Sequence, residues 1–174
     1  WGKRLIDWLN DYTFPEEMRL CDPDYAARIA ERYFDLTLSH GTTTTVSFCT
    51  SHPASVDAFF TAARARGLRA AAGKTCMDRN APADLCDSAQ SAHDDSAALL
   101  ARWHGVDRLS YVITPRFAPT SSAAQLDALG ALWAAPPNSS ARRAPHVHCR
   151  CCARISCMTP TRWPRPAHGG PIAS

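Results

Sequence analysis

Apolar and polar residues follow one another from Trp1 to Ala135 in blocks that predict helices and strands in turn. Between Asp22 and Gly41 the apolar positions recur at helical spacing with charged residues between them, which predicts an amphipathic helix that ends at the glycine. Residues 42–49 are rich in β-branched side chains and predict a strand. A second helix is expected after His52-Pro53, and a second strand at residues 68–75.

The alternation continues, and it predicts a parallel sheet. A long helical region is expected at residues 82–104, a third strand at residues 109–114 and a last helix from Ser121 or Ser122. Short helices and strands in alternation favour βαβ crossovers, so the fold class is α/β. Three parallel strands leave sheet edges unpaired, so the chain forms either a small doubly wound sheet or an arc of a barrel. In an arc the inward-facing apolar side chains are expected to be uncovered: Val46, Phe48, Val112 and Ile113.

Composition changes abruptly after Ala135. All 16 acidic residues lie between Asp7 and Asp127, against 13 basic residues up to Ala135, a net charge of −3. The part after Ala135 holds six basic and no acidic residues, a net charge of +6, with seven of the 13 prolines and four of the eight cysteines. The sequence therefore predicts a domain at residues 1–135 and an unstructured basic, Pro/Arg/Cys-rich tail at residues 136–174.

The tail has three interpretations. The favoured one is out-of-frame translation of a GC-rich gene, because the loss of every acid is abrupt. A second is a metal-binding module, although a single Cys-x-x-Cys without a second pair is weak evidence for structural zinc. A third is charge-driven contact with nucleic acid, which the near absence of stacking aromatics disfavours, Trp163 being the only one. The metal ligands of the second interpretation would come from His146, His148, Cys149, Cys152 and Cys157.

Several cellular settings and cofactors are disfavoured. No run of 18 apolar residues exists to span a bilayer, and the start of the chain lacks the apolar segment of a signal peptide, so a cytoplasmic protein that begins inside a longer one is expected, with no membrane partner. The cysteines before the tail have irregular spacings and predict free thiols: Cys21, Cys49, Cys76 and Cys86. No glycine-rich loop follows a strand, which disfavours a nucleotide cofactor.

Arg116 and Phe117, where the third strand ends, are a candidate recognition pair, although such neighbours are more often a surface charge beside a core ring. Arginine presents a planar fork of donors that suits two acceptors on one edge of a planar ligand, as it does for guanine O6 and N7, and a neighbouring ring offers a stacking face. In a parallel sheet ligands bind at the carboxyl ends of the strands. There His52 and Asp78 could join Arg116, although a histidine before proline is more often a helix-entry residue and this aspartate more often a turn or cap residue.

Four sequence blocks in order resemble guanine deaminases, a family of the amidohydrolase superfamily. The resemblance covers about residues 1–135, and it implies a metal-bearing (β/α)8 barrel of which this chain is the arc with strands two to four. The blocks are Leu9-Asn10-Asp11-Tyr12-Thr13-Phe14-Pro15-Glu16-Glu17, Gly41-Thr42-Thr43-Thr44, Gly73-Lys74-Thr75-Cys76-Met77-Asp78-Arg79-Asn80 and Thr114-Pro115-Arg116-Phe117-Ala118-Pro119-Thr120.

The resemblance also implies an activity and a cofactor. The reaction is hydrolytic deamination of guanine to xanthine and ammonia, with a zinc-bound water as nucleophile and a carboxylate that moves the proton. Arg116 and Phe117 match the family residues that hold the purine. The resemblance names guanine as the small-molecule partner and leaves a homo-oligomer open.

Departures from the family pattern argue against activity of this chain alone. The first two zinc ligands, a His-x-His, would lie before Trp1. Family spacing places a histidine, followed three residues later by the catalytic glutamate, in the window from Ala141 to Arg150, and no glutamate lies there or after it. No catalytic or metal-binding residue is therefore assigned. The alternative is a small non-enzymatic α/β protein with a metal- or nucleic-acid-binding tail.

Overall fold

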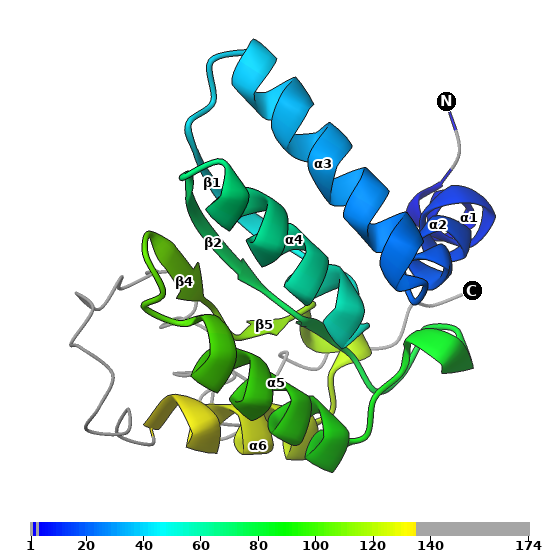
Figure 1. Cartoon of the computed structure of the whole chain (residues 1–174). Coiled ribbons are helices and arrows are strands. Elements are labelled where there is room, and N and C mark those ends of the chain that lie inside the picture. The colour runs from blue at the N-terminus through cyan, green and yellow to red at the C-terminus, as the bar shows by residue number, and fades with distance from the viewer. Residues whose placement is uncertain (1, 3, 135–174) are drawn as a thin grey trace, which may run out of the picture. The chain divides into compact units, whose positions relative to one another are not determined.

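The computed structural model describes Gly2 and residues 4–134 (Figure 1). The tail at residues 136–174, with its three interpretations, lies outside the described residues, so the domain division stays a prediction. Helices and strands alternate in the described part as the sequence predicts. The elements are α1 (Leu5–Trp8), a π-helical turn (Leu9–Thr13), α2 (Phe14–Arg19), α3 (Pro23–Ser39), β1 (Thr44–Phe48), α4 (Pro53–Ala65), β2 (Arg69–Gly73), β3 (Thr75–Cys76), a 3-10 turn (Ala83–Leu85), α5 (Ala89–Trp103), β4 (Leu109–Tyr111), β5 (Thr114–Pro115), a second 3-10 turn (Ala118–Thr120) and α6 (Ala123–Ala134).

The strands form two parallel groups. In the larger group β2 lies between β1 and β4, and the register places Val46 opposite Ala71 and Ala71 opposite Ser110. Each of the second and third predicted strands divides in two, and their distal halves, β3 and β5, pair in parallel. The parallel sheet is thereby confirmed. The two short strands carry the chain on to the loops that hold the recognition pair.

Gly73 is where β2 comes closest to the neighbouring chain. A Cβ atom built on Gly73 would lie 1.8 Å from the backbone oxygen of Val112 and 2.7 Å from the hydroxyl of Thr114. Both distances are far below van der Waals contact, so only glycine allows the two chain segments to approach this closely. This close approach explains why the third sequence block begins with glycine.

One face of the sheet is covered by helices α3, α4 and α5. Phe34 of α3 packs against Phe59 of α4 with 4.8 Å between ring centroids, and Phe60 packs against Trp103 of α5 at 5.5 Å. Alternate strand residues such as Ala72 and Tyr111 complete this core. In Figure 1, α3 and α4 run side by side and α6 lies below α5. Such one-sided cover is what βαβ crossovers produce.

The opposite face of β1 is open. Val46 is 76% exposed and Phe48 is 62% exposed, which confirms the expectation of uncovered inward side chains at these positions. The same expectation is wrong for Val112 and Ile113, which are half-buried. Ile113 packs against two clusters of core side chains, one that includes Ala72 of β2 and one that includes Leu129 of α6, and these contacts cover it.

Helix ends follow the predicted signals, with one difference. Gly41, Gly67 and Gly105 have positive φ angles at or just beyond the carboxyl ends of α3, α4 and α5. The helical region expected from residue 82 is wrong in its first part, because α5 begins only at Ala89. There Ser88 and the third helical residue cap each other's backbone, which fixes the start of the helix.

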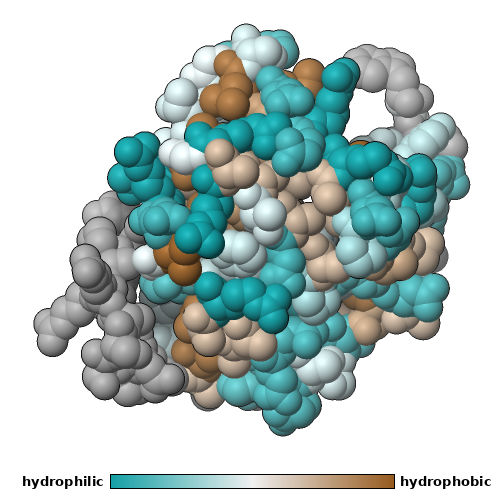
Figure 2. Space-filling model, viewed as in Figure 1, coloured by the Kyte–Doolittle hydropathy of each residue, from teal (hydrophilic) through white to brown (hydrophobic). Residues whose placement is uncertain are grey.

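The described residues contain no helix that is both long enough and apolar enough to cross a membrane. All four cysteines before the tail are free thiols, as the spacings predict. The surface seen in Figure 2 mixes hydrophilic residues with small apolar groups.

Candidate functional site

The paired short strands bring Arg116 to the carboxyl end of the sheet. Pro115 of β5 lies opposite Cys76 of β3, and the backbone N–H of Arg116 donates to the carbonyl oxygen of Cys76 at 3.0 Å. The loop after β3 then binds the chain beyond Arg116, because Asn80 donates to the carbonyl of Pro119 at 2.6 Å. The backbone around Arg116 is thus fixed from both sides.

The Arg116 guanidinium is held at one of its nitrogens. Nη1 donates to Oε2 of Glu17 at 2.7 Å and lies 3.9 Å from the sulfur of Met77. The guanidinium carbon lies 5.4 Å from the ring centroid of Phe14, a cation–π distance. Every hydrogen bond of this guanidinium among the described residues starts from Nη1. The side-on edge, made of Nε and Nη2, therefore has no hydrogen-bond partner among the described residues.

Helix α2 delivers both Glu17 and Phe14 to this place. Proline in its first turn and two glutamates near its amino end favour the helix start. Phe14 is 5% exposed and packs in an apolar cluster with Met77 and Leu85, which anchors α2 over the loop that follows β3. Sequence periodicity did not identify Glu17, because nothing local shows that it meets a residue 99 positions later.

Phe117 differs from Arg116 in its exposure. It is 41% exposed, with an extended backbone, and stands at the start of the 3-10 turn Ala118–Thr120. An exposed ring offers a face on which a planar ligand can stack. Its role in binding stays a prediction.

Asp78 does not join Arg116. Its carboxylate accepts a hydrogen bond from the backbone N–H of Ser122 at 2.8 Å and a second one from the Ser122 hydroxyl, and its own N–H donates to the carbonyl of Thr120. The aspartate thereby fixes the start of α6, which is the cap role that an aspartate at such a position most often has. Ser122 itself accepts from the N–H of Gln125, which confirms the predicted cap of the last helix.

His52 is the helix-entry residue of α4, and no hydrogen bond joins it to Arg116 among the described residues. Its Nε2 is buried without a hydrogen-bond partner in the described part of the chain. Burial lowers the pKa of His52, and the nearby charge of Lys74 lowers it further. The ring is therefore neutral at physiological pH.

Lys74 is a buried charge that the sequence patterns did not single out. Its side chain is 0% exposed, and Nζ lies 2.6 Å from Oδ2 of Asp87 and 3.6 Å from Asp95. Burial raises the pKa of Asp87, against the opposing effect of the lysine. The pair ties the end of β2 to the segment before α5.

Two thiols nearby, those of the half-buried Cys49 and the buried Cys76, are poor nucleophiles. Burial raises the pKa of Cys49 to about 12 and that of Cys76 to about 11. A cysteine reacts as its thiolate, so neither side chain suits covalent catalysis at neutral pH.

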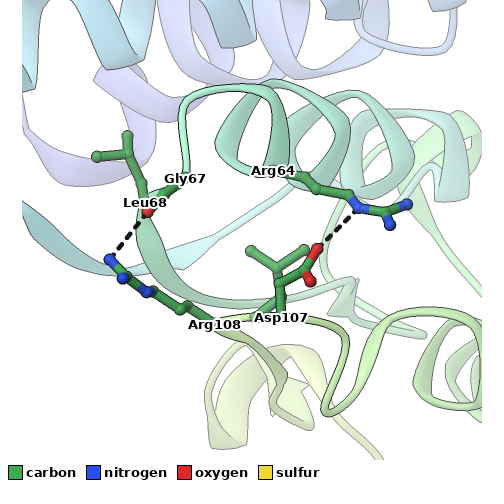
Figure 3. Close-up of a pocket in the computed structure, with 6 residues that line it drawn as sticks. Arg64, Gly67, Leu68, Asp107 and Arg108 are labelled. Atoms are coloured by element: carbon green, nitrogen blue, oxygen red, sulfur yellow. Dashed lines mark hydrogen bonds and ion pairs between the residues drawn. The ribbon is translucent and has the colours of Figure 1, made fainter.

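A shallow pocket of about 180 Å³ lies at the other end of the strands (Figure 3). Asp107 and Arg108, which precede β4, line it together with Arg64 and Gly67. Arg64 Nε donates to Asp107 at 2.9 Å, and Arg108 donates to the carbonyl oxygen of Gly67 at 3.3 Å. Because this is the amino end of the sheet, the pocket is separate from the site at Arg116.

No group of three or more His, Cys, Asp or Glu side chains in the described part of the chain is arranged to hold a metal ion. The described residues of the site therefore offer recognition groups and a buried ion pair, and they do not fit a zinc ion.

The fold and the sequence define the class of protein. The sequence profile of the amidohydrolase family matches residues 2–135, and the chain belongs to this family. The match ends where the composition changes. The α/β arc is thus part of an amidohydrolase barrel, which explains the open face of β1 and excludes the doubly wound alternative.

Within the family the chain is a homologue of guanine deaminases. It is 49% identical to guanine deaminase from Escherichia coli over 126 residues, which is 72% of this chain and 29% of that protein. The solved structure of the E. coli protein superposes with a TM-score of 0.74 over 76% of this chain and 31% of its own. Guanine deaminase from C. acetobutylicum, solved with guanine bound in its active site, is 33% identical with a TM-score of 0.72, over 75% of this chain and 32% of its own. The chain thus spans less than a third of the length of each of these relatives.

Proposed function

We propose that residues 1–134 supply the purine-holding part of a guanine deaminase site, with Arg116 and Phe117 as the substrate-binding residues. The observation that carries the proposal is the state of the Arg116 guanidinium: it is held at Nη1, and its side-on edge has no partner among the described residues. That edge matches two acceptors on one side of a planar base. Guanine presents O6 and N7 in this arrangement.

The chemistry of the base explains how this contact would serve the reaction. Hydrolytic deamination of guanine to xanthine replaces the amine on C2, which points away from the O6–N7 edge. A purine held by Arg116 therefore turns its reacting carbon away from the arginine. Adenine carries an amino donor in place of O6, so the guanidinium would meet a donor with a donor. The proposed contact thus both orients guanine and rejects adenine.

The whole reaction requires groups that the described residues of this chain do not supply. Guanine deamination by this family uses zinc, which supplies an activated water when bound. The described residues do not fit zinc, so the part of this chain is to bind, orient and select the purine. We infer that the chain alone does not deaminate guanine. A cytoplasmic location is part of the same proposal, and the non-enzymatic alternative gains no support from the described residues.

A segment graft tests the proposal. In E. coli guanine deaminase the aligned segment is replaced by residues 4–134 of this chain, and guanine turnover is measured. The graft is expected to deaminate guanine and not adenine. Arg116→Ala in the graft should raise KM for guanine about 5- to 150-fold, because a bidentate base contact contributes roughly 1–3 kcal/mol. Arg108→Ala, at the amino end of the sheet, is the matched control and should leave KM unchanged.

The results that would oppose the proposal are specific. A soluble, zinc-loaded graft that does not act on guanine would overturn it. An active graft in which Arg116→Ala leaves KM unchanged would remove Arg116 from the substrate site.

A further inference from the structure

The contact between Glu17 and Arg116 joins helix α2 to the end of β5. The proposed function uses Arg116 but gives no role to Glu17. Both side chains are mostly withdrawn from solvent, with exposed fractions of 20% for Glu17 and 18% for Arg116. Ion pairs at this depth are screened less than surface pairs, so the contact holds the guanidinium more firmly than a surface pair would.

The neighbouring glutamate of α2 shows that this contact is selective. Glu16 precedes Glu17 by one residue and therefore faces about 100° away around the helix. It pairs with Arg19 at 3.0 Å and accepts a hydrogen bond from the hydroxyl of Tyr25, on the side of α3. Of the two adjacent acids, one serves the packing of α2 on α3, and the other reaches the site.

We propose that Glu17 is a positioning residue for substrate recognition: it holds Arg116 through Nη1 and presents the Nε–Nη2 edge to the purine. The inference rests on the proposed role of Arg116. A free arginine side chain samples many rotamers, and a ligand that binds it must remove much of that rotamer entropy. Glu17, with Phe14 below the guanidinium, removes part of that entropy before the ligand arrives, which is preorganisation.

The contact could also have the opposite effect, in which Glu17 competes with the purine for Arg116, and the two roles can be told apart. If Glu17 competed with the purine for Arg116, its removal would free the guanidinium and lower KM. If Glu17 positions Arg116, its removal lets the side chain move and raises KM. The sign of the change in KM therefore decides between positioning and competition.

The test uses the zinc-loaded graft holoenzyme and five variants: Glu17→Ala, Glu17→Gln, Glu16→Ala, Arg116→Ala and the double variant Glu17→Ala/Arg116→Ala. Glu17→Ala should raise KM for guanine about two- to tenfold, which corresponds to the ordering cost of one long side chain, with little change in kcat. Glu17→Gln, which keeps an acceptor, should recover part of the effect. Glu16→Ala removes an acid from the same helix turn and should leave KM unchanged.

The double variant separates positioning from a structural effect. If Glu17 acts through Arg116, Glu17→Ala adds almost nothing to KM once Arg116 is alanine. If it only stabilises α2, the two changes add, and Glu16→Ala gives a similar effect. An additive result, an unchanged KM in Glu17→Ala or a lowered KM would each overturn the inference, and an unchanged KM in Arg116→Ala would instead overturn the proposed function.

A second measurement covers a graft that does not fold. In the full 174-residue chain, carried on a soluble fusion partner and labelled with ¹⁵N-arginine, the Nε–H signal of Arg116 is identified by its loss in Arg116→Ala. Glu17→Ala is expected to speed hydrogen exchange of this signal, whereas Glu16→Ala is not. Equal exchange in both variants would show that Glu17 does not hold the guanidinium.

Discussion

The buried ion pair between Lys74 and Asp87 should stabilise the arc far more than a surface pair of equal length. Lys74 is fully buried, and Asp87 keeps only 11% of its side chain exposed at an Nζ–Oδ2 distance of 2.6 Å. Lys74→Met would leave the Asp87 carboxylate buried without its main partner. Removal of one member of a buried pair costs about 3–5 kcal/mol. This cost is expected in the free energy of unfolding of the graft.

The chain contains a matched control. Arg102 and Asp57 also lie 2.6 Å apart, but their side chains are 58% and 33% exposed. Arg102→Met should cost about 0.2–1 kcal/mol, the range of exposed pairs. A double variant, Lys74→Met/Asp87→Asn, removes both buried charges. It should be more stable than Lys74→Met, because it leaves no uncompensated charge of this pair buried.

Pulse proteolysis across a urea series gives the midpoint of unfolding for each variant without reference to activity. The loss in the free energy of unfolding caused by Lys74→Met should become smaller as the pH falls from 7 toward 5. Burial already raises the pKa of Asp87 and loss of the lysine raises it further, so the folded protein takes up a proton at a pH where the unfolded chain does not. If Lys74→Met costs no more than Arg102→Met, the reasoning from burial is wrong.

Four further outcomes are expected. Gly73→Ala in the graft should lower the urea midpoint strongly or prevent folding, because its Cβ would lie 1.8 Å from a backbone oxygen; a midpoint within error of the parent would contradict the close approach. The folded state holds the pKa of His52 below its unfolded value, so stability is fully present above about pH 6.5 and falls as the pH drops below it; His52→Asn should flatten this part of the midpoint–pH curve, and an identical curve would exclude His52 as its source. Val46→Thr/Phe48→Thr should raise the soluble fraction of the separately expressed chain, measured after centrifugation, since both apolar side chains are exposed beside an unpaired strand; no gain would point to another cause of aggregation. Translation of the coding DNA in all three frames should show the family pattern continuing in another frame near codon 135, and stop codons throughout both other frames would make the tail genuine.

Local patterns were enough to predict most of the fold. Helical spacing located α3 and α4, β-branched residues located β1, and glycines located three helix ends, because each signal lies within one element. The division of the second and third strands was not predicted, since it depends on the close approach at Gly73, which is a contact between strands. The late start of α5 follows the Ser88 cap, a signal that was present in the sequence but was outweighed by the proline at residue 82.

The site was predicted less completely, because contacts between residues far apart in the chain leave no local pattern. Arg116 and Phe117 were found from their position at a strand end, and the structure places the arginine at the carboxyl end of the sheet as expected. Asp78 turned out to fix α6, although its acidic character and position resembled those of a site residue. Glu17 and Lys74 could not be identified from local patterns, because their importance comes from partners far along the chain or from complete burial.

The distance along the chain between Glu17 and Arg116 also sets an order of events during synthesis. Ribosomes add roughly 5–20 residues per second, so the 99 residues that separate these side chains take about 5–20 s to appear. During that time Glu17 of α2 lacks its partner Arg116. The cluster around Phe14 forms only after Met77 and Leu85 have been made. Helix α2 therefore stays without its contact to Arg116 long after its own residues have been added to the chain.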